Sequence, residues 1–371
     1  MKPIRLIYLI TTLNQGGTER NLIQYCQALD KSKYDLSVWY LCETENSLRP
    51  QLEQAGINLR CLGASGGVNF SDLYSIGKTL AKSKADLIHV FLPTVGYYGV
   101  ASKLMFRSKI PMVFSSGGVQ LVLPFQAQMM KYGVGRYCNP VICNSNFVKQ
   151  FWVDKGLDPE RLRVISNGHE IGKYDLSETR EELRNRFSID NDEFAILCVG
   201  RLIASKRIPD LLRAYSVLKD KVDRKLTLRI AGDGVEMKGL CTLAAELGLN
   251  ADSIFLGQRK DVRQLMKASD VFAFPSESEG SPNAVIESTF SMLPVVASDI
   301  DPCKEVITHE ESGLIYKVGK PEQLGSEIGR IIDDPALGKR LAARAYQESL
   351  NRFEISATLA KLEKAYEDAL V

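Results

Sequence analysis

The sequence predicts an α/β protein with two Rossmann-like domains in tandem, facing a central cleft. Short apolar or β-branched runs alternate with longer segments of helical periodicity, which is typical of βαβ units. Most of the apolar runs lack polar alternation, as expected for parallel strands buried on both faces. The alternation occurs twice, and a polar stretch at residues 168–193 separates the two series. Ligands of such sheets bind beyond the carboxyl ends of the strands, so two facing domains would enclose a site between them.

Length and composition support this division. The chain has 371 residues, of which 45% are hydrophobic and 25% charged, enough for two ordinary domains with cores of their own. We place an N-terminal domain at residues 1–170 and a C-terminal domain at 171–350. We expect a final helix at 351–371 to pack back towards the first domain.

The first series begins at the N-terminus. Residues 1–13 combine two positive charges with a short apolar run, but they lack a small-residue cleavage site, so we interpret them as a core strand and not as a signal peptide. Apolar spacing predicts helices at 20–29 and 70–84. The strands of this series are predicted at 4–10, 36–42, 59–62, 87–91, 112–115, 141–144 and 163–166.

The second series follows a charged helix predicted at residues 178–187. Residues 335–371 are helical in pattern and rich in charge. The strands of this series are predicted at 194–200, 226–232, 253–257, 271–274, 294–297 and 313–316.

Charge and cysteine content exclude several classes of protein. Residues 1–175 hold 20 Lys and Arg against 13 Asp and Glu, whereas the rest holds 27 against 32. A basic first half fits an anionic acceptor or a membrane surface, with chance asymmetry as the alternative. No basic run or aromatic-basic module indicates nucleic-acid binding. The eight cysteines form no C-x2-C pair and indicate the reduced thiols of a cytoplasmic protein. The longest uncharged stretch, 87–102, is too short for a membrane span.

The most informative stretch is residues 275–294. An apolar strand leads into a Glu-Gly-Ser-Pro turn, after which we expect a helix capped by Ser281, with Pro282 at its first position. The N-terminus of a helix is suited to an anion. Glu279 precedes this helix and Glu287 lies eight residues on, so we expect the two carboxylates on one face, ready to accept hydrogen bonds from hydroxyls. This combination fits a nucleotide-diphosphate sugar.

Three further turns follow strands. Arg201 and Lys206 come after the strand at 194–200 and could converge on a diphosphate, with two surface cations as the alternative. Gly16 and Gly17 permit a close approach by a ligand, but they lack the full G-x-G-x-x-G pattern and also suit a plain turn. The Gly-Asp-Gly turn at 232–234 is weaker support.

The histidines and acidic pairs indicate no metal centre. His89 and His169 are either cleft contacts or packed side chains, and we expect His309 to face solvent. Asp299 and Asp301 imitate an Asp-x-Asp metal motif, yet they follow a strand and precede a proline, which indicates a turn. We therefore predict no metal and no cofactor.

Together these segments resemble the family 4 (group 1) retaining glycosyltransferases of the GT-B fold, over nearly the whole chain. The Glu-x7-Glu block with the Gly-Arg-Leu…Lys element is the specific part of the resemblance. The similar segments are the Gly-Gly loop at 13–20, VISNGHE at 164–170, VGRLIASKRIPDLL at 199–212, SDVFAFPSESEGSPNAVIE at 269–287 and the PVVASDI…KEVI…ESGLIY tail that follows.

The resemblance implies roles for these residues. Arg201 and Lys206 would hold the donor diphosphate, Glu279 the hydroxyls of the transferred sugar and Glu287 the ribose hydroxyls. Of these, Glu279, Arg201 and Lys206 would serve catalysis. The other implied donor contacts are Gly16, Gly17, Gly280, Ser281, Pro282 and Asn283.

The candidate contacts on the acceptor side are His89, Ser116, Gly117, Asn167 and His169. Many family members carry a histidine after the matching strand, but PMVFSSGGVQ at 111–120 has none, so Ser115, Ser116 or backbone groups would replace it near Gly117.

The resemblance implies a metal-independent, retaining transfer of a hexose or N-acetylhexosamine from a nucleotide-diphosphate sugar to a hydroxyl of a glycan or lipid-linked glycan. We expect UDP as the nucleotide. Peripheral contact of the basic N-terminal domain with the inner face of the cell membrane is an additional hypothesis. The alternatives are a catalytically silent nucleotide-sugar-binding partner in a glycan synthesis complex and a GT-B epimerase or phosphorylase. A two-lobed solute-binding protein would need an export signal.

Overall fold

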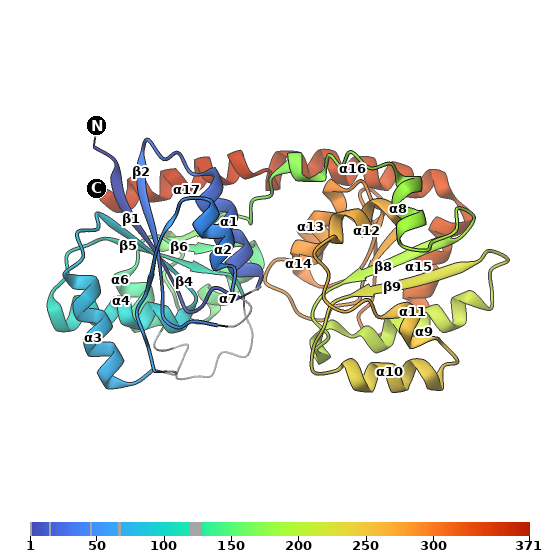
Figure 1. Cartoon of the computed structure of the whole chain (residues 1–371), viewed down its shortest axis with the longest axis horizontal. Helices are drawn as coiled ribbons and strands as arrows, with labels where there is room; N and C mark the ends of the chain where they lie inside the picture. Colours follow the sequence, from blue (N-terminus) through green and yellow to red (C-terminus); the bar gives the residue numbers. More distant parts are fainter. Residues whose placement is uncertain (1, 15, 45–46, 66–67, 119–127, 129) are drawn as a thin grey trace. The chain divides into compact units, whose positions relative to one another are not determined.

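The computed structural model describes residues 2–14, 16–44, 47–65, 68–118, 128 and 130–371, and it divides the chain into two compact units (Figure 1). Unit 1 comprises Met1–His169 and Phe353–Val371, and unit 2 comprises Glu170–Arg352. Each unit is an α/β sandwich with a wholly parallel sheet. The prediction of two Rossmann-like domains is confirmed.

Unit 1 contains a seven-stranded sheet in the order β3-β2-β1-β4-β5-β6-β7. Its strands are β1 (Ile4–Ile10), β2 (Tyr34–Tyr40), β3 (Asn58–Cys61), β4 (Leu87–Phe91), β5 (Met112–Ser116), β6 (Val141–Cys143) and β7 (Leu162–Val164). Its α-helices are α1 (Gly17–Ala28), α2 (Arg49–Gln54), α3 (Phe70–Ala81), α4 (Pro93–Phe106), α6 (Gly135–Tyr137), α7 (Asn146–Asp154) and α17 (Ile355–Leu370), with a π-helical turn at Met130–Val134.

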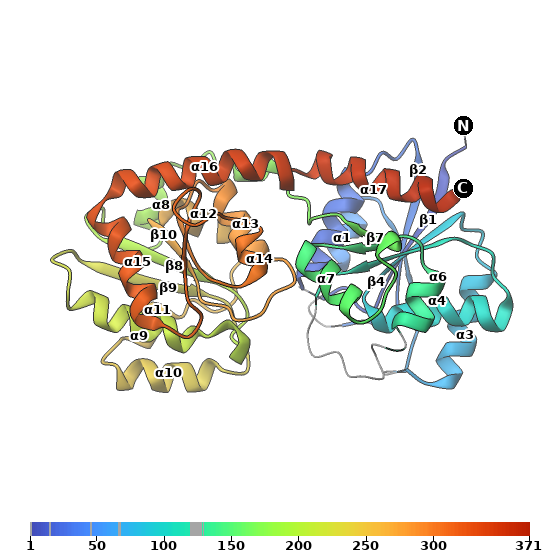
Figure 2. The same ribbon diagram turned by 180° about the vertical axis from the view of Figure 1, so that it is seen from behind.

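Helices cover both faces of this sheet (Figures 1 and 2). On one face α1 and α17 pack against alternate strand residues such as Leu6, Tyr8 and Leu87. On the other face α3, α4 and α7 cover the intervening residues, among them Ile88 and Val90. Burial on both faces explains why these strands read as continuous apolar runs in the sequence.

Unit 2 contains a five-stranded sheet in the order β12-β11-β10-β8-β9. Its strands are β8 (Phe194–Val199), β9 (Leu226–Ala231), β10 (Val271–Phe274), β11 (Val295–Ser298) and β12 (Leu314–Tyr316). Its α-helices are α8 (Arg180–Arg186), α9 (Ile208–Lys219), α10 (Met237–Glu246), α11 (Ala251–Ile254), α12 (Val262–Ala268), α13 (Asn283–Phe290), α14 (Asp301–Lys304), α15 (Pro321–Asp333) and α16 (Pro335–Phe353).

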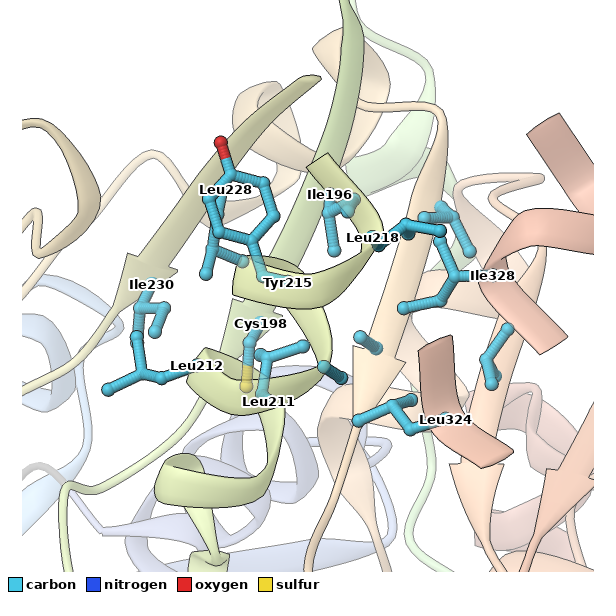
Figure 3. Packing of buried hydrophobic residues seen from close by; sticks show 14 of the residues in the cluster. Ile196, Cys198, Leu211, Leu212, Tyr215, Leu218, Leu228, Ile230, Leu324 and Ile328 are labelled. Carbon is cyan, nitrogen blue, oxygen red and sulfur yellow. The ribbon is translucent and has the colours of Figure 1, made fainter. Parts of the chain in front are cut away.

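The core of unit 2 lies between this sheet and helices α9 and α15. Figure 3 shows Leu211, Tyr215 and Leu218 of α9 turned towards the strands, while Leu324 and Ile328 come from α15. All five side chains are at least nine-tenths buried. Each fully buried leucine or isoleucine contributes about 1.5–3 kcal/mol of transfer free energy, so this layer stabilises the fold of unit 2.

The predictions for residues 253–257 and for the start of the charged helix were wrong. Residues 253–257 do not form a strand. The Asn250 side chain caps the short helix α11 by accepting a hydrogen bond from Asp252 N, and this helix continues to Ile254. Only Phe255 bridges to the sheet, through Ile230. The charged helix α8 begins at Arg180 and not at residue 178, because Thr179 and Glu182 form a capping box there.

Candidate functional site

The candidate site of unit 2 lies where two neighbouring strands end. β10 pairs with β8, and β8 separates β10 from β9, so the chain reverses its direction of winding between β8 and β10. Ligands of doubly wound sheets bind at the carboxyl ends of the strands beside such a switch point. The loop with Arg201 and Lys206 follows β8, and the loop with Glu279 follows β10. The fold therefore brings together segments that lie more than seventy residues apart in sequence.

The loop after β8 presents two cations in different states. Arg201 is exposed, and among the described residues its guanidinium has no hydrogen-bond or ion-pair partner. Lys206 ends a 3-10 turn, Ala204–Lys206, and is only 15% exposed. Its ammonium lies 5.3 Å from the centroid of the Phe274 ring, a cation–π contact with the last residue of β10. Arg201 thus leaves its donors available to an anion, whereas the position of Lys206 is fixed.

Lys206 also forms an ion pair with Glu279, whose side chain is 14% exposed. The two loops are joined by backbone contacts as well: Glu277 N donates to Ser205 O at 2.9 Å and Ser276 Oγ to the same oxygen at 3.2 Å. A half-buried ion pair in such a frame is weakly screened by solvent. The predicted phosphate-binding cation and the predicted sugar-binding carboxylate therefore meet directly.

The start of α13 differs from the prediction. The helix begins at Asn283 with Pro282 as its N-cap residue and no side-chain cap, so the prediction that Ser281 caps it was wrong. The reason is a tight turn in which Asn283 N donates to Ser281 O at 3.0 Å, which shifts the start of the helix by one residue. Gly280 and Ser281 are half-buried in the turn, beside Glu279.

Glu279 and Glu287 consequently do not share a helical face, since Glu279 lies in the turn before α13 and Glu287 in its second turn. Glu287 is half-buried near Tyr174. Burial first, and then the negative charge of Glu287, raises the pKa of the Tyr174 hydroxyl, while Arg263 lies 5.4 Å from the centre of its ring. Sequence reasoning missed Tyr174 and Arg263, because no motif connects them to Glu287.

The Gly-Asp-Gly turn after β9 supports the Arg201 loop by packing against it. Leu202 N donates to Asp233 O at 2.9 Å and Glu236 N to Leu202 O at 3.0 Å. A Cβ added at Gly232 would clash with the Gly200 carbonyl, and one at Gly234 with the Leu202 carbonyl. The structure therefore gives both glycines a packing reason independent of any ligand.

We expect Gly232→Ala to destabilise unit 2 by about 3 kcal/mol, since backbone must move to admit the methyl group and the φ of +155° suits glycine. Urea unfolding followed by far-ultraviolet circular dichroism measures the change. Gly239→Ala is the matched control, because a Cβ at that helical position meets open space. Equal stability of the two variants would contradict the close packing of the Gly-Asp-Gly turn against the Arg201 loop.

Both carboxylates of the acidic pair after β11 have partners within unit 2. Asp299 accepts from Val318 N at 2.9 Å, and Asp301 pairs with Lys304 at 2.7 Å within one helical turn. His309 is half exposed and accepts from Ile315 N. Within the described ranges, no group of three or more His, Cys, Asp or Glu side chains is arranged to hold a metal ion.

In unit 1, the Gly-Gly turn leads into α1 with Gly16 as its N-cap residue. The Glu19 side chain is nine-tenths buried and folds back over Gly16, where an added Cβ would meet its carboxylate. Gly17 is the first residue of the helix. Gln15, in the segment that resembles the family loop, lies outside the described residues.

The carboxyl end of β5 lies beside this turn. A Cβ at Gly117 would lie 3.2 Å from Thr18 Oγ1, and Asn144 Nδ2 donates to Gly117 O at 3.0 Å. Ser116 is buried and accepts a hydrogen bond from Trp152 Nε1 at 2.8 Å. Residues 119 and 120 of the segment that lacks the family histidine lie outside the described residues.

His89 is completely buried in β4, so its side chain has no surface with which to touch a ligand. Its Nδ1 lies 2.7 Å from the Tyr366 hydroxyl of α17, which donates to Tyr8 at 2.9 Å, and its Nε2 lies 2.7 Å from Ser115 Oγ. Burial lowers the pKa of His89 to about 3. The neutral ring is therefore a structural link between the last helix and the end of β5.

A neutral buried histidine makes unit 1 sensitive to acid. The pKa of His89 lies below its unfolded value of 6.5, so the unfolded chain binds more protons and stability falls as the pH drops below 6.5. We expect a loss of about 2 kcal/mol between pH 7 and pH 5 that His89→Gln does not show. Both tryptophans, Trp39 and Trp152, belong to unit 1, so their fluorescence reports its unfolding in urea. Parallel pH profiles of the two proteins would contradict this assignment.

Asn167 and His169 lie at the end of the first part of unit 1 and are both buried. His169 N donates to Phe353 O at 2.8 Å, and Ile355 N donates to His169 O at 2.9 Å. These two hydrogen bonds join the backbone N–H and C=O of His169 to the start of α17. A contact between the His169 side chain and an acceptor stays a prediction.

Comparison with known proteins identifies the class. The model for glycosyl transferases group 1 matches residues 179–348, and the model for glycosyltransferase family 4 matches residues 15–172. Between them the two models span nearly the whole chain. The chain therefore belongs to the family 4 (group 1) glycosyltransferases.

Two of the relatives that match over nearly their whole length are bacterial glycosyltransferases. The UDP-Gal:alpha-D-GlcNAc-diphosphoundecaprenol alpha-1,3-galactosyltransferase of Escherichia coli is 24% identical, over 96% of this chain and 95% of its own. The capsular polysaccharide biosynthesis glycosyltransferase CapH of Staphylococcus aureus is 23% identical, over 98% of both chains.

Among solved structures, Anabaena Alr3699/HepE in complex with UDP-glucose superimposes with a TM-score of 0.86 at 21% identity, covering 98% of this chain and all of that chain. Sucrose-phosphate synthase from Thermosynechococcus elongatus gives a TM-score of 0.82 at 19% identity, covering 98% of both chains. These likenesses show the fold, which is GT-B.

Proposed function

We propose that the chain moves a hexose or N-acetylhexosamine from a UDP-sugar to a hydroxyl of a glycan or lipid-linked glycan, with retention of configuration and without a metal ion. The observation that carries this proposal is that the exposed Arg201 shares the loop after β8, at the switch point of unit 2, with Lys206, which pairs with Glu279. The names of the relatives support the substrate classes, since one uses UDP-galactose and a lipid-diphosphate acceptor. HepE supports UDP as the nucleotide, since it binds UDP-glucose.

The chemistry follows from the charges at the site. As the bond between the sugar and the diphosphate breaks, its electron pair passes to the β-phosphate oxygen, where negative charge grows. Arg201 and Lys206 would stabilise that charge more than the ground state, which lowers the barrier. Glu279 would bind the sugar hydroxyls and also hold Lys206 in place. The acceptor hydroxyl would attack the same face of the sugar, and its proton would pass to the departing phosphate oxygen.

Glu287 would bind the nucleotide. Its carboxylate lies in the second turn of α13, beyond the Gly280–Asn283 turn that would give backbone donors to the phosphates. Tyr174 lies near Glu287 and Arg263 packs over the Tyr174 ring, so Tyr174 would help to orient the Glu287 carboxylate and Arg263 would hold Tyr174 in place. On the acceptor side, Gly17, Ser116, Gly117, Asn167 and His169 stay candidates, whereas the buried His89 would act only through Ser115.

Product analysis tests the proposal. The protein is incubated with UDP-glucose, UDP-galactose and UDP-N-acetylglucosamine, together with N-acetylglucosamine-diphosphoundecaprenol and a panel of related lipid-linked sugars, with and without EDTA. We expect transfer from one donor, unaffected by EDTA, to a product with the α configuration of that donor. A β-linked product would overturn retention. Binding of a donor without transfer to any acceptor would favour the silent binding partner, and epimerised donor would favour the epimerase.

We also propose that the protein works at the inner face of the cell membrane as a peripheral protein, since the E. coli relative acts on a lipid-linked substrate. In the part of the chain that the structure describes, no helix has both the length and the apolar character that crossing a bilayer requires.

A further inference from the structure

A chain of hydrogen-bonded polar side chains crosses the apolar core of unit 1. Its members come from four different elements, namely Tyr8 of β1, Tyr366 of α17, His89 of β4 and Ser115 of β5. The first three side chains are completely buried, whereas Ser115 is half-buried near the carboxyl end of its strand. Burying polar groups among apolar neighbours is costly, so such a chain calls for a reason. The Ser115 hydroxyl is the member through which the chain reaches the surface.

The direction of these hydrogen bonds follows from one of them. Tyr366 donates its hydroxyl proton to Tyr8 over 2.9 Å, so at its other bond, of 2.7 Å, it must accept from His89 Nδ1. Burial lowers the pKa of His89 to about 3, so the ring is neutral and carries a single N–H, on Nδ1. Nε2 is left with a lone pair, and Ser115 Oγ, 2.7 Å away, donates its proton to it. Through His89, the last helix of the chain therefore fixes the direction of the Ser115 hydroxyl.

Ser115 consequently presents an oxygen whose proton is already in use. A serine hydroxyl has one proton and two lone pairs. Within the described ranges, His89 is the one hydrogen-bond partner of this hydroxyl. The free lone pair can accept a hydrogen bond from a hydroxyl or an amide N–H. It cannot serve a ligand atom that only accepts, such as a phosphate oxygen, so Ser115 is suited to a sugar and not to a diphosphate.

Ser115 lies where a ligand of unit 1 is expected. It is in register with Phe91, the last residue of β4. In the sheet, β4 lies between β1 and β5, and β1 separates it from β2, so the winding reverses between β1 and β4. Ligands of such sheets bind at the carboxyl ends of the strands beside the switch point. The Ser115 oxygen is therefore one strand away from that point, at the carboxyl edge.

We propose that Ser115 accepts a hydrogen bond from a hydroxyl of the sugar acceptor. His89 and the two tyrosines are positioning residues, which act on the substrate only through Ser115. This inference rests on the proposed function and adds which kind of group the acceptor offers at this contact. An acceptor whose matching position holds an atom that only accepts, such as fluorine, would place lone pairs against lone pairs. The contact therefore makes the enzyme specific for a free hydroxyl at one position of the acceptor.

The tautomer of His89 tests the direction of the chain without any substrate. Nitrogen NMR of the full chain with isotope-labelled histidine reads which ring nitrogen carries the proton, and His89→Gln assigns the signal among the three histidines. We expect the proton on Nδ1 in the wild type. In Tyr366→Phe no hydroxyl is left to accept from Nδ1, so we expect the proton to move to Nε2. Ser115 would then accept a hydrogen bond from Nε2, and its own proton would become free.

Tyr34→Phe is the matched control for the NMR measurement. The Tyr34 ring packs edge-on against Tyr366, with centroids 5.9 Å apart, but its hydroxyl is not a member of the chain. The proton should therefore stay on Nδ1 in this variant. Unchanged thermal unfolding shows that each variant is folded. A proton on Nε2 in the wild type, or one that stays on Nδ1 in Tyr366→Phe, overturns the proposal.

Acceptor analogues test the contact itself. The probes are N-acetylglucosamine-diphosphoundecaprenol and its analogues in which fluorine replaces each sugar hydroxyl in turn, except the one that is glycosylated. We expect kcat/KM of the wild type to fall about tenfold for one analogue, since a hydrogen bond is lost and the Ser115 oxygen is left unpaired. Ser115→Ala and Tyr366→Phe should treat this analogue and its parent within a factor of about two. The first variant lacks the oxygen, and the second presents a proton to the fluorine.

The ratio between the two acceptors separates this proposal from a merely structural role. A structural role would change the stability or the overall rate of the variants, but not that ratio. Equal discrimination by the wild type, Ser115→Ala and Tyr366→Phe would overturn the proposal. If the protein transferred no sugar although Nδ1 carried the proton, the proposed function would be wrong and the acceptor contact with it, whereas the direction of the chain would stand.

Discussion

Arg201→Ala is expected to lower sugar transfer by about 10²- to 10³-fold while leaving the stability of unit 2 unchanged. The guanidinium is exposed and has no partner within the described part of the chain, so removing it disturbs no folded contact. It would act only on the charge that develops on the departing diphosphate, which predicts a loss in kcat. Steady-state kinetics of nucleotide release with the best donor measures the effect.

The control for Arg201→Ala is Lys238→Ala, which removes one exposed positive charge from the same unit outside the site. Its kinetics should match those of the wild type. Turnover of Arg201→Ala within a factor of about two of the control would exclude Arg201 from the chemistry. A parallel loss of stability would assign the residue to folding instead.

The second large effect concerns the two glutamates, which should fail in different ways. Glu279→Gln removes the partner of Lys206 and a contact to the transferred sugar, so we expect kcat to fall by about 10²-fold. Glu287→Gln weakens binding of the ribose hydroxyls, which are bound equally well in the ground state and the transition state. We therefore expect KM for the donor to rise about tenfold with little change in kcat. Steady-state kinetics over a range of donor concentrations separates the two parameters.

A control variant completes this test. Glu277→Gln is a suitable control, since Glu277 lies in the same loop but pairs with Arg207 on an exposed surface. If Glu279→Gln and Glu287→Gln gave the same division between kcat and KM, the separate roles of the two residues would be wrong. If neither changed, the loop after β10 would not bind the donor.

Much of the fold could be predicted because apolar patterning determines it. The strands β1, β4 and β10 coincide with the predicted runs, residue for residue, since each is a buried run bounded by polar or turn residues. Residues 253–257 show the limit of this reasoning. Their apolar content suits a strand, yet a local cap at Asn250 turned the segment into a short helix with a single bridge to the sheet.

Candidate residues of the site could be proposed from the sequence, whereas the contacts between them could not. Motif and position indicated Arg201, Lys206, Glu279 and Glu287. The ion pair between Lys206 and Glu279 depends on how two loops pack beside each other, and no sequence spacing encodes that. The same holds for His89, whose partner Tyr366 is 277 residues away, on the last helix of the chain.

Calorimetric titration of nucleotides tests the central claim, that the loops after β8 and β10 form a nucleotide-diphosphate site. UDP, GDP and ADP are titrated into the wild-type protein, Arg201→Ala, Glu287→Gln and the Lys238→Ala control. We predict that UDP binds with one site per chain and that the first two variants each weaken it about tenfold or more, whereas the control does not. UDP binding of equal strength in all four proteins would contradict the account, as would a wild-type protein that binds none of the three nucleotides.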